Sequence, residues 1–111
     1  MITVKGKTLM LSANDTFMTL FQAYGALLDG TETIYFNINA EPDGSAPIKR
    51  IPCGIDRLNN IISIYATKSE MSVLEAGKTY WYDLTMDTPT GLHMTLIYPS
   101  KLIVREVMHS D

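Results

Sequence analysis

Cysteine and histidine are scarce in this chain of 111 residues, and each shortage excludes a kind of site. Cys53 is the only cysteine, which excludes an internal disulfide and a cysteine-rich zinc cluster. We expect Cys53 to be a buried, inert thiol. His93 and His109 are the only histidines, and neither has a second ligand at the spacing that a zinc site uses. The sequence therefore predicts no metal and no other cofactor.

Long apolar runs and an excess of basic charge are also missing. An export signal needs about 7–15 consecutive apolar residues and a spanning helix about 20, and no such run occurs. We therefore expect no signal peptide, no membrane partner, and synthesis and folding in a cytoplasm. Nine basic residues against twelve acidic ones, with no basic run, argue against a nucleic-acid partner.

Motifs for catalysis are the third absence. Ser12, Ser45 and Ser100 lie outside any nucleophile elbow, and the chain has no glycine-rich phosphate loop. Asp83 and Asp87 lie beside an expected turn, where carboxylates are usually solvated. A glycosidase would need such a pair to flank a cleft. The sequence thus predicts no catalytic residue and indicates that the protein is not an enzyme.

Short extended segments separated by turn residues are what the chain does contain. Residues 33–40 alternate between apolar and polar side chains, the pattern of a strand with one buried face. Residues 16–24 are apolar on both sides, which favours a central strand, although periodicity leaves a helix open. The spacing of Thr67 and Glu70 is that of a capping box, which predicts one or two helical turns. Further strands are expected at residues 2–11 (bent at Gly6), 48–51, 61–66, 79–86, 92–97 and 101–107.

About seven or eight strands at this close spacing indicate an all-β sandwich or barrel. We expect a single domain over residues 1–111, because that length suits one hydrophobic core.

Leu74, Gly77 and Tyr80 follow one another at intervals of three residues and resemble the tyrosine corner of immunoglobulin-like sandwiches. There the chain crosses between sheets, and the tyrosine hydroxyl bonds to a backbone group a few residues upstream. Leu74 would anchor the crossing in the core, and Gly77 would adopt a backbone conformation that other residues resist. The alternative is a turn that happens to precede an aromatic strand. The motif favours an immunoglobulin-like antiparallel β-sandwich with one short helical turn.

An inward Tyr80 places Trp81 on the outer face of its sheet. Trp81 and Tyr35 are then candidates for a protein contact, since exposed aromatics often anchor interfaces. The alternative for Trp81 is that a loop or the N-terminal segment covers it. A further alternative is a carbohydrate-binding or adhesin module, in which Tyr35, Tyr65 and Trp81 project from one sheet and stack on sugar rings.

Three groups of motifs follow one another between Asp15 and Val107. The first is an Asn-Asp-Thr start with an Asp-Gly turn, and the second is an extended strand with a polar loop. The third is a Ser-Glu helical turn, a Leu-X-X-Gly corner, a Tyr-X-Tyr-Asp-Leu strand and a Thr-Leu pair. The segments are Asn14–Phe17, Leu28–Gly30, Ile34–Pro47, Ser69–Glu70, Leu74–Gly77, Tyr80–Leu84 and Thr95–Ile97. Together they resemble the small immunoglobulin-like domains of phage and prophage tails, such as the N-terminal domain of baseplate upper proteins from phages of Gram-positive bacteria. The chain departs from that pattern at Tyr98-Pro99-Ser100, where the family usually has a glycine.

The resemblance implies a non-enzymatic structural component of a bacteriophage or prophage tail or baseplate, located in the virion tail. Its expected partners are other tail or baseplate subunits, further copies of the same chain included. It would act by burying strand edges and outward aromatics against its neighbours.

Overall fold

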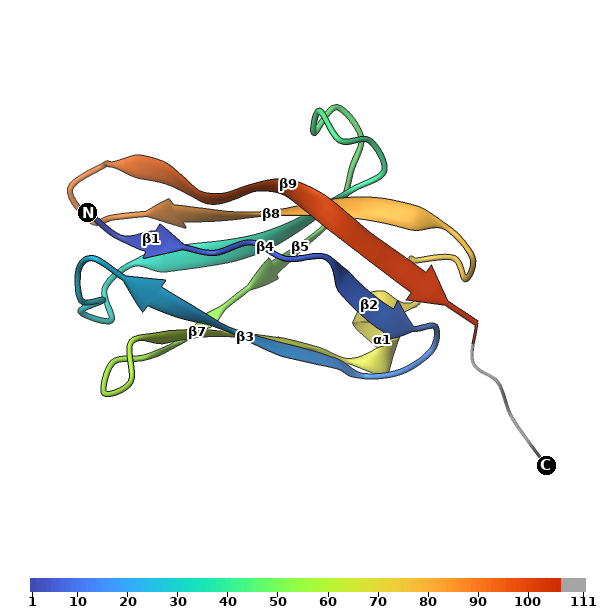
Figure 1. Cartoon of the computed structure of the whole chain (residues 1–111), viewed down its shortest axis with the longest axis horizontal. Helices are drawn as coiled ribbons and strands as arrows, with labels where there is room; N and C mark the ends of the chain where they lie inside the picture. The colour runs from blue at the N-terminus through green and yellow to red at the C-terminus, as the bar shows by residue number, and fades with distance from the viewer. Residues whose placement is uncertain (107–111) are drawn as a thin grey trace.

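The computed structural model describes residues 1–106, which form two β-sheets packed face to face and one short helix (Figure 1). One sheet has the strand order β1-β3-β7-β6 and the other β2-β9-β8-β4-β5. The elements are β1 (Thr3–Val4), β2 (Leu9–Ser12), β3 (Phe17–Tyr24), β4 (Thr33–Asn39), β5 (Pro47–Pro52), β6 (Gly54–Asp56), β7 (Ile61–Ala66), α1 (Lys68–Met71), β8 (Thr79–Asp87) and β9 (His93–Arg105).

This strand order is that of an immunoglobulin-like sandwich, so the expected all-β class is confirmed. Residues 1–106 contain nine strands rather than seven or eight. The segment expected at residues 2–11 divides into β1 and β2, and the two strands expected at 92–97 and 101–107 are one, β9. β6 is the strand that the sequence did not indicate, because Pro52 and Gly54 read as a break. The strand predicted at residues 16–24 is β3, and it is an inner strand between β1 and β7.

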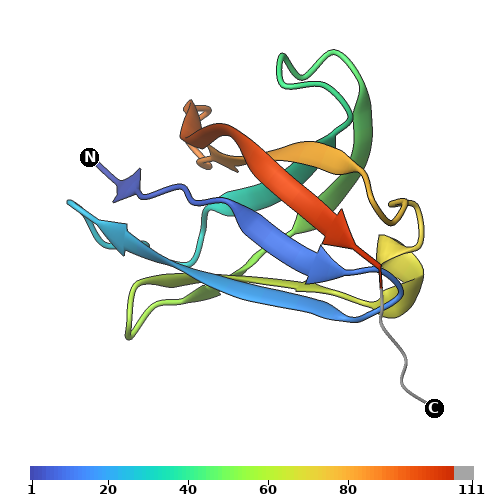
Figure 2. The ribbon, with the colours of Figure 1, turned by 45° about the vertical axis from the view of Figure 1, so that its right-hand side comes forward.

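The inward side chains of both sheets form one hydrophobic core within the described residues, between the two layers seen in Figure 2. Phe36 and Tyr82 stack at its centre with 5.0 Å between ring centroids. Phe17 lies 5.9 Å from Phe36, and Phe21 lies 6.1 Å from Tyr82. Since β3 belongs to one sheet and β4 and β8 to the other, these aromatic contacts join the two layers.

The first strand segment divides between the two sheets. β1 pairs with β3, whereas β2 pairs with β9 in the parallel direction. The expectation of an antiparallel sandwich is therefore wrong at this one pair of strands. The crossing includes Gly6, where a Cβ would lie 2.7 Å from the side chain of Ile97. The Tyr82 hydroxyl stabilises the segment between β1 and β2, because it accepts a hydrogen bond from the Lys7 N–H and donates one to the Lys7 carbonyl.

The chain also changes sheet between β5 and β6, with Cys53 as the single connecting residue. β5 lies at an edge of its sheet, as expected for residues 48–51, and has a proline at each end. The opposite edge is β2, with four residues, and the four-stranded sheet ends in the two residues of β1 and the three of β6. Short edges and prolines limit pairing with further strands.

The final strand is continuous, which corrects the prediction of two strands separated by Tyr98-Pro99-Ser100. Tyr82 pairs with Ser100 and Leu84 with Ile97, so Tyr98 and Pro99 both stand opposite Asp83. This is a β-bulge, where a residue needs no partner in the ladder and proline is tolerated. Val107, the predicted end of the strand, lies outside the described residues.

The helical turn after β7 has the capping box that the sequence predicted. Thr67 Oγ1 accepts a bond from the Glu70 N–H, and the Glu70 carboxylate accepts one from the Thr67 N–H. α1 carries the chain from β7 in one sheet towards β8 in the other. In the part of the chain that the structure describes, no helix has the length and apolar character to cross a membrane.

Candidate functional site

The segment between α1 and β8 crosses from the four-stranded to the five-stranded sheet, as the sequence predicted. The hydroxyl of Tyr80 accepts a bond of 2.8 Å from the Glu75 N–H, five residues upstream. Leu74 and Tyr80 are both buried in the core. The hydrogen bond of a tyrosine corner is therefore present.

Gly77 has a φ of +82°, and a Cβ there would meet no atom within 4 Å. Its backbone conformation, rather than crowding, thus favours glycine. The Gly77 N–H donates to the carbonyl of Val104 at 2.8 Å, which ties the corner to β9. The corner is a structural element, and chemically reactive or binding side chains are found elsewhere, on the outer faces of the sheets.

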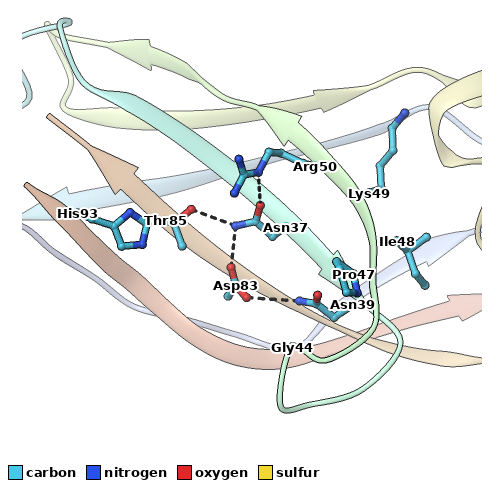
Figure 3. A pocket seen from close by; sticks show the side chains of 10 residues that line it. All are labelled: Asn37, Asn39, Gly44, Pro47, Ile48, Lys49, Arg50, Asp83, Thr85 and His93. Carbon is cyan, nitrogen blue, oxygen red and sulfur yellow. Dashed lines mark hydrogen bonds between the residues drawn. The ribbon is translucent and has the colours of Figure 1, made fainter. Parts of the chain in front are cut away.

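A polar network covers the middle of the outer face of the five-stranded sheet (Figure 3). Asn37 is its hub. Its Nδ2 donates to Asp83 Oδ1 at 2.8 Å and to Thr85 Oγ1 at 3.0 Å. Its Oδ1 accepts a bond of 3.0 Å from Arg50 Nε. Asn39, only 4% exposed, donates to Asp83 Oδ2 at 3.4 Å.

Arg50 is held in a fixed orientation over this face. Its guanidinium carbon lies 4.4 Å from the centroid of the Tyr35 ring, a cation–π contact. The bond from Nε to Asn37 also orients the guanidinium group. Asp83 is only partly exposed and forms no salt bridge with a residue between 1 and 106.

Beside the network, the β4–β5 loop helps to enclose an open depression of about 520 Å³. Its lining residues come from β4, β5, β8, the loop and the start of β9, as Figure 3 shows: Asn37, Asn39, Gly44, Pro47, Ile48, Lys49, Arg50, Asp83, Thr85 and His93. The depression offers amide and carboxylate oxygens together with cationic donors, so it suits a polar, uncharged ligand better than a strongly charged one.

Trp81 and Tyr35, the predicted contact residues, both lie on this outer face and are partly buried. Trp81 pairs with Asn39 and Tyr35 with Thr85, so they stand four positions apart, about 13 Å along the strands. Tyr65 belongs to β7 in the other sheet. The proposed platform of Tyr35, Tyr65 and Trp81 is therefore wrong, because the three rings do not project from one sheet.

The outer face of the four-stranded sheet is different and was not identified from the sequence. Met18 is 70% exposed, Leu20 58% and Tyr65 56%. Met18 lies directly opposite Tyr65, and Leu20 is opposite Ser63 on the same pair of strands. Neighbours in this arrangement touch across the strands. We call Met18, Leu20 and Tyr65 the apolar triad.

Other exposed apolar residues extend this surface. Tyr24 follows on β3, while Leu27 and Leu58 lie in loops at the same end of the sheet, around a second hollow. Asp56 is the only charged residue in β1, β3, β6 and β7. Its carboxylate accepts bonds from the Leu58 and Asn59 N–H groups. The signal in the sequence is that residues 16–24 are apolar on both sides, a pattern that favours a central strand and that here leaves one apolar side exposed.

The remaining candidate groups are scattered. Cys53 is half-buried rather than buried as expected, and this partial burial raises the pKa of its thiol to about 12, which favours an inert thiol. His93 bonds Asp87 at 2.7 Å in the β8–β9 hairpin, and His109 lies outside the described residues. Between residues 1 and 106, no group of three His, Cys, Asp or Glu side chains could hold a metal ion.

No protein-family model and no curated protein matches this chain.

Proposed function

We propose that this chain is a non-enzymatic structural component of a bacteriophage or prophage tail or baseplate and that it acts by protein–protein assembly. Support comes first from the resemblance of its motifs, whose corner of Leu74, Gly77 and Tyr80 has the expected hydrogen bond. In this proposal the fold is a rigid scaffold that presents its two outer faces to neighbouring subunits.

The observation that carries the proposal is the apolar triad. Three large apolar side chains, each more than half exposed, lie together on a sheet face. A contiguous exposed apolar patch typically marks an interaction site. The edges β1, β2 and β6 are short and the edge β5 has a proline at each end, which limits strand addition, so assembly would use the sheet faces rather than the edges.

Tail particles from the strain that encodes the chain provide the test. After prophage induction, purified particles are probed with an antibody against this protein and by mass spectrometry. The protein is expected to co-purify with the particles in a fixed ratio to other tail subunits. Particles that contain none of it, from cells that express it, would contradict the proposal.

A second candidate function, saccharide binding, is favoured by the depression on the five-stranded sheet. Planar amides, a carboxylate and an arginine are the groups that bind sugar hydroxyls, and here Asn37 holds them together. Trp81 stands at one end of this network, where a sugar ring can stack against its side chain, and Tyr35 at the other end supports Arg50.

Titration with neutral oligosaccharides of glucose, galactose and N-acetylglucosamine, followed by Trp81 fluorescence, tests this second function. Binding is expected to be lost in Tyr35→Ala and retained in Tyr65→Ala, because only Tyr35 contacts Arg50, which lines the depression. Equal loss in both variants, or no saturable signal in the unmodified protein, would exclude this site.

A further inference from the structure

Asn39 is a buried side chain that lines the depression and has an unused acceptor. Its Nδ2 donates to Asp83 Oδ2, whereas its Oδ1 accepts no hydrogen bond from residues 1–106. In Figure 3 the dashed line of this amide ends at its nitrogen, and the oxygen has none. In the same part of the chain, no side-chain oxygen that is closed off from solvent lacks a partner. The Asn39 oxygen is therefore accessible from the depression.

Arg50 supplies the unused donors of the same depression. Its Nε bonds Asn37, but neither of its terminal nitrogens donates to a residue between 1 and 106, nor does a carboxylate there form a salt bridge with it. A guanidinium has five N–H donors, so most of them are left for a ligand. Arg50 pairs with Asn37, and Asn39 lies two positions further along β4, which is about 7 Å.

We infer that this depression recognises an acetamido group, and that its ligands are N-acetylated amino sugars rather than sugars with hydroxyls alone. The N–H of the acetamido group would donate to Asn39 Oδ1, and its carbonyl would accept from Arg50. The inference rests on saccharide binding, the second function proposed above, and names the class of saccharide.

A secondary amide fits the separation of acceptor and donor. Its N–H and its carbonyl point to opposite sides of one planar group, and each forms a hydrogen bond of about 2.9 Å. Together these bonds and the amide between them bridge the distance from Asn39 to Arg50. A hydroxyl has donor and acceptor on one oxygen and therefore reaches less far. The hydrogen bond from the amide carbonyl to the charged Arg50 is of the stronger, charge-assisted kind.

The walls around Asn39 suit the rest of such a ligand. Pro47 pairs with Asn39 on one side, and the next residue, Ile48, is only partly buried against the core. Both line the depression and offer apolar contacts to the acetyl methyl group. Trp81 pairs with Asn39 on the other side, so a sugar ring stacked on this tryptophan would hold its acetamido substituent beside Asn39.

The charges of the depression disfavour the corresponding free amine. An amino sugar without its acetyl group has a positive charge at the position of the amide nitrogen. Lys49 and Arg50 both line the depression and would repel that charge. The amine also lacks the carbonyl that Arg50 would bind.

Isothermal titration calorimetry with three β-1,4-linked trisaccharides tests the inference. They are built from N-acetylglucosamine, from glucose and from glucosamine, and they differ only in the substituent at carbon 2 of each ring. The acetylated trisaccharide is expected to bind at least about tenfold more tightly than the other two. Trp81 fluorescence during the same titrations provides a second measurement.

Two variants remove the acceptor and the donor in turn. Asn39→Ala should bind the acetylated and the glucose trisaccharide with about equal affinity. Arg50→Met retains an apolar stem beside Tyr35 and should bind the acetylated trisaccharide at least about tenfold more weakly. Arg57→Met is the matched control, because Arg57 is also exposed but lines the hollow on the opposite side of the sandwich; it should bind like the unmodified protein.

The fold of each variant is checked by circular dichroism. Arg50 is exposed, so Arg50→Met keeps the inference testable even where Asn39→Ala does not fold. Equal affinity of the unmodified protein for the acetylated and the glucose trisaccharide would overturn the inference, as would a preference that persists in Asn39→Ala. Equal effects of Arg50→Met and Arg57→Met would also overturn it.

Failure of this inference is distinguishable from failure of saccharide binding itself. Binding of all three trisaccharides without preference contradicts only the recognition of the acetamido group. Absence of binding by all three contradicts the second function as well. N-acetylglycine N-methylamide presents the same amide chemistry without a sugar ring, and tighter binding of this compound than of the acetylated trisaccharide would identify a peptide as the ligand and overturn the inference.

Discussion

The two outer faces of this sandwich are built from the same alternating strands, yet their chemistry is opposite. The four-stranded sheet has a single charged residue, Asp56, which is engaged in a turn. The five-stranded sheet has six among Asp, Glu, Lys and Arg: Lys49, Arg50, Asp83, Asp87, Lys101 and Arg105. Two of them, Arg50 and Asp83, belong to the polar network.

The difference shows how each face is stabilised. On the polar face, Asn37 and Asn39 donate hydrogen bonds to Asp83, so this carboxylate is satisfied inside the chain. On the apolar face, Met18, Leu20 and Tyr65 are exposed to water, which is unfavourable for large apolar side chains. A partner is therefore expected to cover the apolar face, whereas the polar face can accept a small ligand.

The largest expected effect on stability comes from the loops at the end of the apolar face. Asn60 is buried and has a φ of +55°. Its Oδ1 accepts a hydrogen bond from the Leu28 N–H, and its Nδ2 donates to the carbonyls of Ala23 and Ala26. Asn60→Ala should lower the free energy of unfolding by about 2–4 kcal/mol, because several buried groups lose their partners. Urea denaturation measures the loss. Asn59→Ala, at an exposed neighbour, is the control, and an equal loss in both variants would contradict this role.

The second prediction compares the two faces directly. Asn37→Ala should cost about 1–2 kcal/mol of unfolding free energy, because it removes the hub of the polar network. Leu20→Ser should change it by less than about 0.5 kcal/mol, since an exposed side chain contributes little to the monomer. Both are measured by urea denaturation at concentrations too low for self-association. The comparison fails if Leu20→Ser is the more destabilising.

The third prediction concerns the corner that joins the two sheets and so keeps the faces in register. Tyr80→Phe removes the bond to the Glu75 N–H and should lower the unfolding free energy by about 1 kcal/mol. Tyr98→Phe alters an exposed tyrosine on β9 and should leave thermal unfolding unchanged. Identical melting curves for Tyr80→Phe and the unmodified protein would show that the hydroxyl is dispensable.

The smallest effect is expected from carboxylates that border each face. Hydrogen bonds from Asn59 lower the pKa of Asp56 beside the apolar face, and bonds from Ser45 lower the pKa of Asp43 beside the polar face. Each contributes stability that is present above the pKa of the unfolded chain and is lost as pH falls towards the lowered folded value. The thermal midpoint should therefore decrease slightly below about pH 5. Asp56→Asn and Asp43→Asn should each weaken this pH dependence; an unchanged profile in either would exclude that carboxylate.

Much of the fold could be predicted from local pattern. The alternation in residues 33–40, the capping box at Thr67 and Glu70, and the corner at Tyr80 each depend on neighbours close in sequence. The structure has all three. β6 and the continuity of β9 through Pro99 were missed, because a bulge and a change of sheet depend on pairing with strands far along the chain.

The candidate surfaces were only partly predictable. The outward direction of Trp81 and Tyr35 followed from strand alternation, but the network around Asn37 joins β4, β5 and β8, whose register no local pattern specifies. The placement of Tyr65 failed for a related reason, since alternation gives the side of a strand and not the sheet to which it belongs.

The sequence by itself determined that short strands with one buried side would form an all-β sandwich, because alternation and turn residues act over a few positions. Only the tertiary structure decided which strands share a sheet, and with that which outward residues meet. Met18, Leu20 and Tyr65 become one apolar surface because β3 and β7 pair, and Asn37 and Asp83 become one polar network because β4 and β8 pair. Such pairings depend on how all the buried sides fill one common core.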